Sequence, residues 1–537
     1  MDGIKDEADT TAIGQAQSVP SGQAGDPTPY HVSERWWLLL VALVAGAVCA
    51  PFLRTVYWLG DEGVLLRGAE QILTGRRLYV DFFEFLPPAG FDLTAAWLGL
   101  VCVSFVSARL LAVLTIIGTA CFTYLACRQA SKNAPLSAFL TFGWLAMSQG
   151  WGTQVSHHWF TTMFSMVAAW ASLASFGSPH ERLRWPLMAG LAAGTAAMVT
   201  PTRGALAMIA AATAFLNPRR QRTKLFIYLV GGALVPLALL AYLISDKAFT
   251  SAFDDVIVWT AKRYAPIQPV PFGAFAEIQN RPLRYLFPLV FLLSCFAFWR
   301  SRYSCLRDRP LMTSASFGLA GFVGCFPRPD IYHIAFVAPL ALPLLATCSV
   351  RLTRTWPLIY RCIVLVVLIA FCIPSLRALS WMYQKALLTA HVESPRGRVA
   401  IVGPPGAREM LARITATPSE DGFFFYPYMP LLPFLAARQH VARYDIFVPG
   451  YTLSSEYRDA CRSTLRDASW VVLDRIWMDF ALLKMVFPSM RDGVPVETRR
   501  FEQTLESNFD LVAKEGSFEL RHRRKDVGAA ACDGIGQ

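Results

Sequence analysis

Four carboxylates follow the first long apolar run of the chain closely enough to form a reactive site. Asp61 and Glu62 come within a few residues of the run, and Asp81 and Glu84 follow in the same polar segment. If the run crosses a membrane, Asp61 lies at the membrane surface, where a carboxylate can take a proton from a hydroxyl group. Asp81 and Glu84 could orient that hydroxyl or hold a divalent cation. A solvated loop with acidic residues at helix starts would give the same pattern.

Basic side chains form a second group of candidates. Arg203 and Arg328 stand at the ends of apolar runs, and Lys262 and Arg263 lie in the aromatic stretch 259–264. Cations in such positions can stabilise a departing phosphate. Snorkelling at the membrane interface is an alternative explanation for Lys262 and Arg263.

Imidazoles form a third group. His157 and His158 are neighbours, so on a helix they point about 100° apart and would not bind one metal ion together. One imidazole facing a cavity and one hydrogen-bonded in its wall is the better interpretation. Asp330 and His333 are three residues apart and would share a helix face as an acid–imidazole pair.

The composition determines which elements must carry these groups. Of the 537 residues, 54% are apolar and only 16% are charged, whereas soluble domains carry about 25% charge. Mean hydropathy is +0.38. These values exclude a soluble enzyme, a disordered chain and a disulfide scaffold, and they predict a polytopic α-helical membrane protein. The net charge of +12 lies mainly in short loops between apolar runs, so no nucleic-acid partner is expected.

The apolar runs predict about eleven transmembrane helices. The segment 91–106 is short and no Gly, Pro or Asn turn separates it from the next run, so we interpret it as an interfacial helix. The predicted spans are 36–53, 108–127, 134–151, 158–177, 186–200, 203–217, 225–244, 284–299, 310–326, 331–349 and 356–376.

Alternate loops between these spans carry fourteen basic residues and two acidic ones. The positive-inside rule makes these loops cytoplasmic. The N-terminus is then inside and the C-terminus outside. The first outer loop (54–92), a second large outer loop (245–283) and the C-terminal tail all lie on the outer face.

Four parts follow from this map. The composition of residues 1–34 predicts a disordered cytoplasmic tail, and residues 35–380 are expected to form the transmembrane domain that holds the candidate catalytic residues. Residues 395–525 predict a small α/β domain on the outer face, and 526–537 a flexible tail. The expected strands of the α/β domain are 398–402, 470–473 and the hairpin of 509–513 with 517–521 around Glu515 and Gly516. Cys461 and Cys532 both fall in the polar tail, and the sequence leaves open whether they form a disulfide.

The order of several motifs resembles that of the GT-C superfamily, which comprises polytopic glycosyltransferases that use polyprenyl-phosphate sugars. The pattern is similar to the branch of the protein O-mannosyltransferases and the lipid A aminoarabinose transferase, in bacterial members. The motifs are the acidic pair 61–62, Gly-x-x-Leu-Tyr-x-Asp at 75–81, Pro-Pro at 87–88, Ala-Arg-Leu at 108–110, Ser-His-His-Trp at 156–159, Thr-Pro-Thr-Arg-Gly at 200–204, Arg-Pro-Asp-Ile-Tyr-His at 328–333, Phe-Tyr-Pro-Tyr at 425–428, Arg-Tyr-Asp at 443–445 and Pro-Gly at 449–450.

The resemblance implies a role for each candidate residue. Asp61 matches the catalytic carboxylate, and Glu62 and Asp81 match its acidic companions. The expected donor-phosphate ligands are Arg203, Lys262, Arg263 and Arg328, and the expected cavity residues are Glu84, His157, His158, Asp330 and His333. The two adjacent histidines stand where the family often has a second acidic residue, which suggests a branch with its own acceptor.

The implied activity is transfer of one sugar from a polyprenyl-phosphate donor to an acceptor in the cell envelope, with Asp61 as general base. The acceptor is a glycan, a lipid or a protein, and membrane lipid is a further partner. No cofactor is certain, and a divalent cation is a candidate. The expected location is the bacterial inner membrane, as a multi-pass protein with a periplasmic C-terminal domain.

Two other functions are compatible with a multi-span chain. A transporter or flippase of a lipid-linked sugar would perform no catalysis, but it predicts repeated halves and ionisable residues near mid-span, neither of which is evident. A transferase that uses diphosphate-linked donors would place its basic residues in a large late outer loop.

Overall fold

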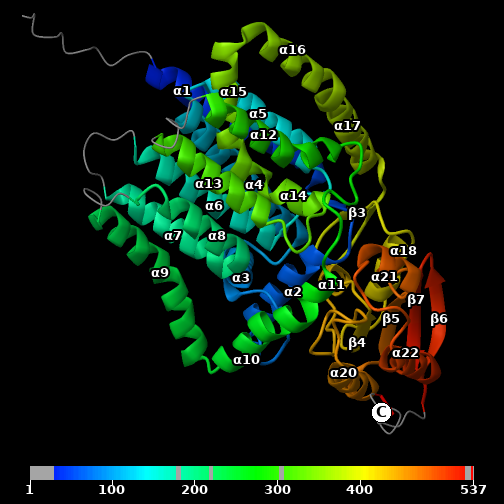
Figure 1. Ribbon diagram of the computed structural model, residues 1–537. Helices are drawn as coiled ribbons and strands as arrows, with labels where there is room; N and C mark the ends of the chain where they lie inside the picture. The colour runs from blue at the N-terminus through cyan, green and yellow to red at the C-terminus, as the bar shows by residue number, and fades with distance from the viewer. Residues whose placement is uncertain are drawn as a thin grey trace, which may run out of the picture.

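Long charge-free runs form the helices of this protein, because a backbone in lipid must satisfy its own hydrogen bonds. The structure is a computed structural model that describes residues 30–176, 183–216, 222–300 and 308–525, together with 532, 534 and 535. A helical bundle makes up most of the molecule, and a smaller part with two sheets packs beside one end of it (Figure 1). Most of the predicted tails, 1–29 and most of 526–537, lie outside the described residues.

Each predicted span coincides with a helix or a pair of consecutive helices. These are α1 (Tyr30–Cys49), α4 (Phe105–Ser131), α5 (Ala134–Ser148), α6 (His157–Ala174), α7 (Arg184–Val199), α8 (Pro201–Ala212), α9 (Arg222–Ser245), α12 (Leu286–Arg300), α13 (Arg309–Val323), α14 with α15 (Ile331–Val337, Leu342–Thr355) and α16 with α17 (Pro357–Val367, Ile373–Leu388).

Among the described residues, five helical stretches are long and apolar enough to cross a membrane: Arg35–Phe52, Phe105–Ser131, Arg222–Ser245, Ile331–Arg354 and Pro357–Leu388. The chain is therefore a membrane protein. The count of eleven spans stays a prediction, because several of the other helices are shorter than a bilayer requires when taken alone.

Two predicted boundaries are wrong. Helix α1 begins at Tyr30, inside the segment predicted to be disordered. The segment 91–106 is not one helix either, because α3 (Pro88–Leu100) ends before α4 begins at Phe105. Ser104 caps α4 by accepting a hydrogen bond from the backbone N–H of Ser107 at 3.2 Å, so a serine cap provides the break that Gly, Pro or Asn usually provide. At 13 residues, α3 is about 20 Å long and shorter than the hydrocarbon core of a bilayer.

The first outer loop and the C-terminal tail form one structure. Strand β1 (Thr55–Val56) pairs in parallel with β3 (Val399–Ile401), with Thr55 opposite Ala400. Strand β2 (His391–Val392) pairs antiparallel on the other side of β3, so ordered tail structure begins slightly before residue 395. This small sheet joins segments more than 300 residues apart in sequence.

A second sheet in the tail has the order β4-β5-β7-β6. Strands β4 (Phe423–Tyr426) and β5 (Trp470–Asp474) are parallel, and β6 (Phe509–Glu515) forms a hairpin with β7 (Phe518–Arg523). The strands expected at 470–473 and around Gly516 are therefore present. The helices around this sheet are α18 (Ala407–Thr415), α19 (Leu431–Ala436), α20 (Ser454–Asp467), α21 (Phe480–Val486) and α22 (Val496–Asn508).

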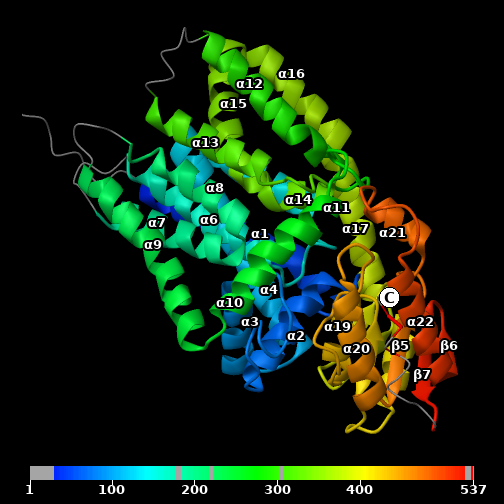
Figure 2. The ribbon, with the colours of Figure 1, turned by 60° about the horizontal axis from the view of Figure 1, so that its bottom comes forward.

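A shared hydrophobic core holds α2 (Asp61–Leu73) between the bundle and the tail. Leu65 from α2, Phe91 from α3 and Leu431 from α19 are buried in it together with Phe425 from β4. Both views show α2 beside the tail (Figures 1 and 2). The loop 245–283, with α10 (Phe249–Phe253), the π-helix η2 (Asp254–Tyr264) and α11 (Ala265–Ile267), contributes Trp259 to a further core shared with the tail.

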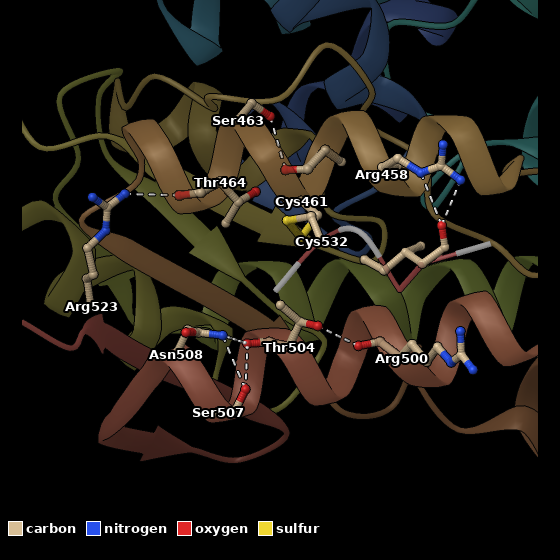
Figure 3. The surroundings of a disulfide bond; sticks show 12 residues. Arg458, Cys461, Ser463, Thr464, Arg500, Thr504, Ser507, Asn508, Arg523 and Cys532 are labelled. Atoms are coloured by element: carbon tan, nitrogen blue, oxygen red, sulfur yellow. Dashed lines mark hydrogen bonds between the residues drawn. A yellow bond between two sulfur atoms is a disulfide. The ribbon is translucent and has the colours of Figure 1, made fainter. Parts of the chain in front are cut away.

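A disulfide between Cys461 and Cys532 resolves the pairing that the sequence left open. It ties the end of the chain to α20, and Cys532 lies between α20 and α22 (Figure 3). The carbonyl oxygen of Ile535 accepts two hydrogen bonds from the Arg458 guanidinium, at 2.9 and 3.1 Å, which hold the same segment in place.

Candidate active site

Asp61 is the first residue of α2 and its side chain is exposed. A carboxylate in the first turn of a helix is favoured by the positive end of the helix dipole. The hydroxyl of Tyr428, from the loop after β4, donates a hydrogen bond of 2.6 Å to Asp61 Oδ1. The predicted base therefore lies at the junction between α2 and the C-terminal tail.

Glu62 points in a different direction from Asp61 and is buried. Its carboxylate forms an ion pair of 2.8 Å with Arg109 from α4 and accepts a hydrogen bond of 2.9 Å from the N–H of Val155. Burial raises the pKa of Glu62, and Arg109 acts against that rise. In this position Glu62 anchors α2 to the bundle and is not placed as an exposed catalytic companion of Asp61.

A chain of charged and imidazole side chains lies at the ends of the bundle helices. Arg328 Nε donates to Asp330 Oδ2 at 2.8 Å, and Asp330 Oδ1 accepts from His333 Nδ1 at 2.7 Å. The His333 ring lies 5.0 Å from the ring of His158, measured between centroids. Arg203 Nη1 in turn donates to His158 Nδ1 at 2.8 Å. We call these five residues the cationic cluster.

Local sequence explains why the cluster assembles at helix starts. Ser156 caps α6, so His157 and His158 occupy the first turn of that helix. Asp330 caps α14 through the N–H of His333, and Arg203 lies in the first turn of α8 after a proline. A hydrogen bond of 2.8 Å between Thr161 and Thr200 holds the starts of α6 and α8 together. The positive ends of two helix dipoles therefore face a site that already holds two guanidinium groups.

Tyr264, the last residue of η2, lies within electrostatic reach of Asp61 and of three members of the cationic cluster. Its pKa is raised by burial and by the nearby carboxylates of Asp61 and Asp330, and is lowered by Arg328 and Arg203. The predicted base and the predicted phosphate ligands therefore both act electrostatically on this one phenol. Gln268 in the same loop accepts a hydrogen bond of 3.1 Å from Arg328 Nη1.

Solved structures with a similar arrangement of helices are known. The crystal structure of ArnT from Cupriavidus metallidurans in the apo state matches with a TM-score of 0.54 and 15% identity, over 91% of this chain and 98% of that chain. The same protein bound to undecaprenyl phosphate matches with a TM-score of 0.52 and 15% identity, over 92% and 98% of the two chains. The chain therefore has the fold of ArnT over nearly its whole length.

The fold shared with ArnT confirms the fold that the motif resemblance implied. No protein-family model matches the chain, and no curated protein sequence is significantly similar to it. At 15% identity the likeness covers nearly the whole chain and says nothing about the roles of individual residues.

Asp81 and Glu84 have contacts of their own outside the cationic cluster. Asp81 accepts a hydrogen bond of 2.7 Å from the N–H of Arg77, which keeps the pKa of Asp81 low. It lines a cavity of about 250 Å³ between the first loop and α20, with Arg76 and Arg443. Glu84 is buried, and burial raises its pKa well above the usual range.

Lys262 and Arg263 are exposed on η2. Arg263 lies near Glu456 of the tail, whose pKa it lowers against the stronger effect of burial. His157 is half-buried, and its ring packs 3.8 Å from that of His158. Within the described ranges, no group of three or more His, Cys, Asp or Glu side chains is arranged to hold a metal ion.

Three residues of this region had no role in the prediction from sequence. Arg109 and Tyr428 lie in motifs that resemble the family, but only the fold shows that they contact Glu62 and Asp61. Tyr264 stands next to the two basic residues that were selected, and an aromatic residue beside Lys and Arg carries no pattern that would separate it from an interfacial anchor.

Proposed function

We propose that the protein is a membrane glycosyltransferase that moves a sugar from a polyprenyl-phosphate donor to an acceptor of the cell envelope. The observation that carries the proposal is the cationic cluster, in which His158 and Asp330 hold the guanidinium groups of Arg203 and Arg328. The GT-C fold shared with ArnT supports it, as does the fact that ArnT binds undecaprenyl phosphate. A polyprenyl-phosphate leaves as an anion at the membrane surface, which suits two arginines at helix starts.

In the proposed reaction an acceptor hydroxyl attacks the anomeric carbon of the donor sugar. Asp61 takes the proton of that hydroxyl as the new carbon–oxygen bond forms. The bond between the anomeric carbon and the phosphate oxygen breaks, and the electron pair leaves with the polyprenyl phosphate. Arg203 and Arg328 stabilise the phosphate charge that develops, while Asp330 and His158 hold the two guanidinium groups in place.

The disulfide supports an outward-facing tail. Disulfides persist in the bacterial periplasm and are rare in the cytosol. The Cys461–Cys532 bond therefore suits a tail that lies outside, as the basic loops between the spans predict. Asp61 contacts the same tail through Tyr428, so the reaction would take place on the periplasmic side of the inner membrane.

The first test measures sugar release by the purified protein from a panel of polyprenyl-phosphate sugars. Wild type is expected to release sugar from one donor of the panel, and Asp61→Asn should lose about 100- to 10,000-fold of that rate. Asp254→Asn makes the same change at an exposed position of the second outer loop and should keep wild-type activity. Wild-type turnover by a folded Asp61→Asn would refute the role of Asp61.

The same preparation distinguishes a transferase from a flippase. In sealed vesicles, a flippase would move the lipid-linked sugar across the bilayer without releasing the polyprenyl phosphate. Release of sugar that needs an added acceptor, and that falls in Arg203→Met, indicates transfer. Translocation without release for every donor of the panel would favour the flippase.

A further inference from the structure

The contact between Asp61 and Tyr428 joins two ends of the chain. Tyr428 is 367 residues from Asp61 in sequence, and its hydroxyl donates a hydrogen bond of 2.6 Å to Asp61 Oδ1. Burial and the Asp61 carboxylate raise the pKa of Tyr428 well above its usual value. The phenol therefore stays protonated at any working pH and remains a hydrogen-bond donor.

Aromatic packing fixes the ring of Tyr428. Trp58 lies edge-on to it with ring centroids 6.4 Å apart. Trp477 of the tail packs in turn against Trp58, with ring centroids 4.8 Å apart. A Cβ atom at Gly60 would lie 2.7 Å from the ring of Tyr428 and closer still to Trp58, so only glycine fits there. The ring is held by both the first loop and the tail.

The backbone around this contact is equally constrained. The N–H of Leu431 donates to the carbonyl of Leu59 at 2.9 Å, which ties the segment after Tyr428 to the residues before Asp61. One turn into α2, Gly63 lies so close to Leu431 that a Cβ atom would be 2.0 Å from the Leu431 nitrogen. Further along α2, Arg67 forms a buried ion pair with Asp445 of the tail. These three contacts therefore fix the tail relative to α2, the helix that begins with Asp61.

We propose that Tyr428 is a positioning residue for Asp61, so that the C-terminal tail completes the active centre. The inference rests on the proposed function of Asp61 as general base. The phenol occupies Oδ1 and fixes the plane of the carboxylate, which leaves Oδ2 to take the proton of the acceptor hydroxyl. Without the phenol the carboxylate can rotate about its side-chain bonds, and the geometry for proton transfer is lost for much of the time.

Tyr428→Phe tests this role because it removes only the hydroxyl. We expect kcat to fall by about 10- to 100-fold, the range for a hydrogen bond to a charged group, with the KM for the polyprenyl-phosphate sugar within about twofold of wild type. Tyr426→Phe is the matched control. It removes the same hydroxyl two residues earlier, where the hydroxyl donates to Glu502 inside the tail at 2.9 Å, and it should keep wild-type kcat.

Several results would overturn the role of Tyr428. Wild-type kcat in Tyr428→Phe would do so, and so would an equal loss in Tyr426→Phe, because general damage to the tail would then explain both. A rise in KM with unchanged kcat would make Tyr428 a ligand of the donor instead of a support for the base.

Thermal unfolding separates this proposal from the proposed function. Asp61→Asn, Tyr428→Phe and the double variant form a double-mutant cycle in stability, and non-additive shifts in Tm show that the two groups interact. Full turnover by Asp61→Asn would refute the base even if the cycle shows coupling. An additive cycle, with Asp61→Asn inactive, would refute the positioning role alone.

Discussion

Replacing Arg109 by methionine tests how α2, and with it Asp61, is held against the bundle. The side chains of Glu62 and Arg109 are 1% and 3% exposed, and their charged atoms lie 2.8 Å apart. Coulomb's law with an effective dielectric constant of about 20 gives roughly 6 kcal/mol for unit charges at this separation. Desolvation offsets part of that energy, and removing one partner of a buried pair costs about 3–5 kcal/mol. We expect Arg109→Met to lower the free energy of unfolding by that amount.

The loss of unfolding free energy in Arg109→Met should depend on pH, and the titration of Glu62 determines whether it grows or shrinks as the pH rises. Burial raises the pKa of Glu62, and Arg109 limits the rise. In Arg109→Met the pKa of Glu62 rises further, because the carboxyl must then ionise without a partner as the pH increases. A group whose folded pKa is raised loses stability as pH rises, and the deficit of the variant relative to wild type should therefore be larger at about pH 8 than at about pH 5.

Thermal unfolding in detergent, followed by tryptophan fluorescence, measures this change. For a chain of this length that melts as one unit, about 4 kcal/mol corresponds to a fall in Tm of roughly 3–4 °C. The double variant Glu62→Gln with Arg109→Met should recover part of the loss, since no unpaired charge remains buried. Arg377→Met, at an exposed arginine of α17, is the control and should change stability by less than about 0.5 kcal/mol. A fall in Tm no larger than that of the control, or a larger deficit at the lower pH, would refute the reasoning.

Three further predictions concern the tail and its contacts. Replacing Cys461 and Cys532 by serine removes a cross-link that closes 71 residues, and should lower the free energy of unfolding by about 4 kcal/mol, measured as a lower Tm than that of non-reduced wild type; an unchanged Tm would contradict it. Burial raises the pKa of Asp255 to about 7, so Asp255→Asn should raise the free energy of unfolding at about pH 8 by roughly 1–2 kcal/mol after allowance for partial exposure, seen as a higher Tm, with a smaller gain at about pH 5. Gly63→Ala forces a methyl group against the backbone of the tail and should cost about 1–3 kcal/mol and reduce sugar release, whereas Gly143→Ala, with no atom within 4 Å of the added Cβ, should be neutral in both assays.

Local patterns predicted much of this protein correctly. Apolar runs marked the positions of the helices, because hydrophobicity over a helix-length window depends only on residues near in sequence. The hairpin around Gly516 was predicted for the same reason, since a tight turn and its two strands are neighbours along the chain. The break after Leu100 was missed because a serine cap is a weaker sign of a helix boundary than glycine or proline.

For the candidate site, too, local sequence patterns identified individual residues but not their contacts. Asp61, Arg203, Arg328 and the pair of Asp330 with His333 stood out because ionisable residues at the ends of apolar runs are rare. Their selection needed no knowledge of the fold. Glu62 was selected by the same rule, although the structure buries it against Arg109.

Which of these groups meet one another was decided by tertiary structure alone. The amino-acid sequence alone indicated a membrane-embedded helical chain with unusual charges at the ends of its helices. The contacts of Asp61 with Tyr428, of β1 with β3 and of Arg203 with His158 join residues 45 to 367 positions apart. Such contacts depend on how helices and strands pack, and packing leaves no periodic pattern in one sequence. For that reason the folded chain, and not the sequence, places the C-terminal tail beside the proposed base.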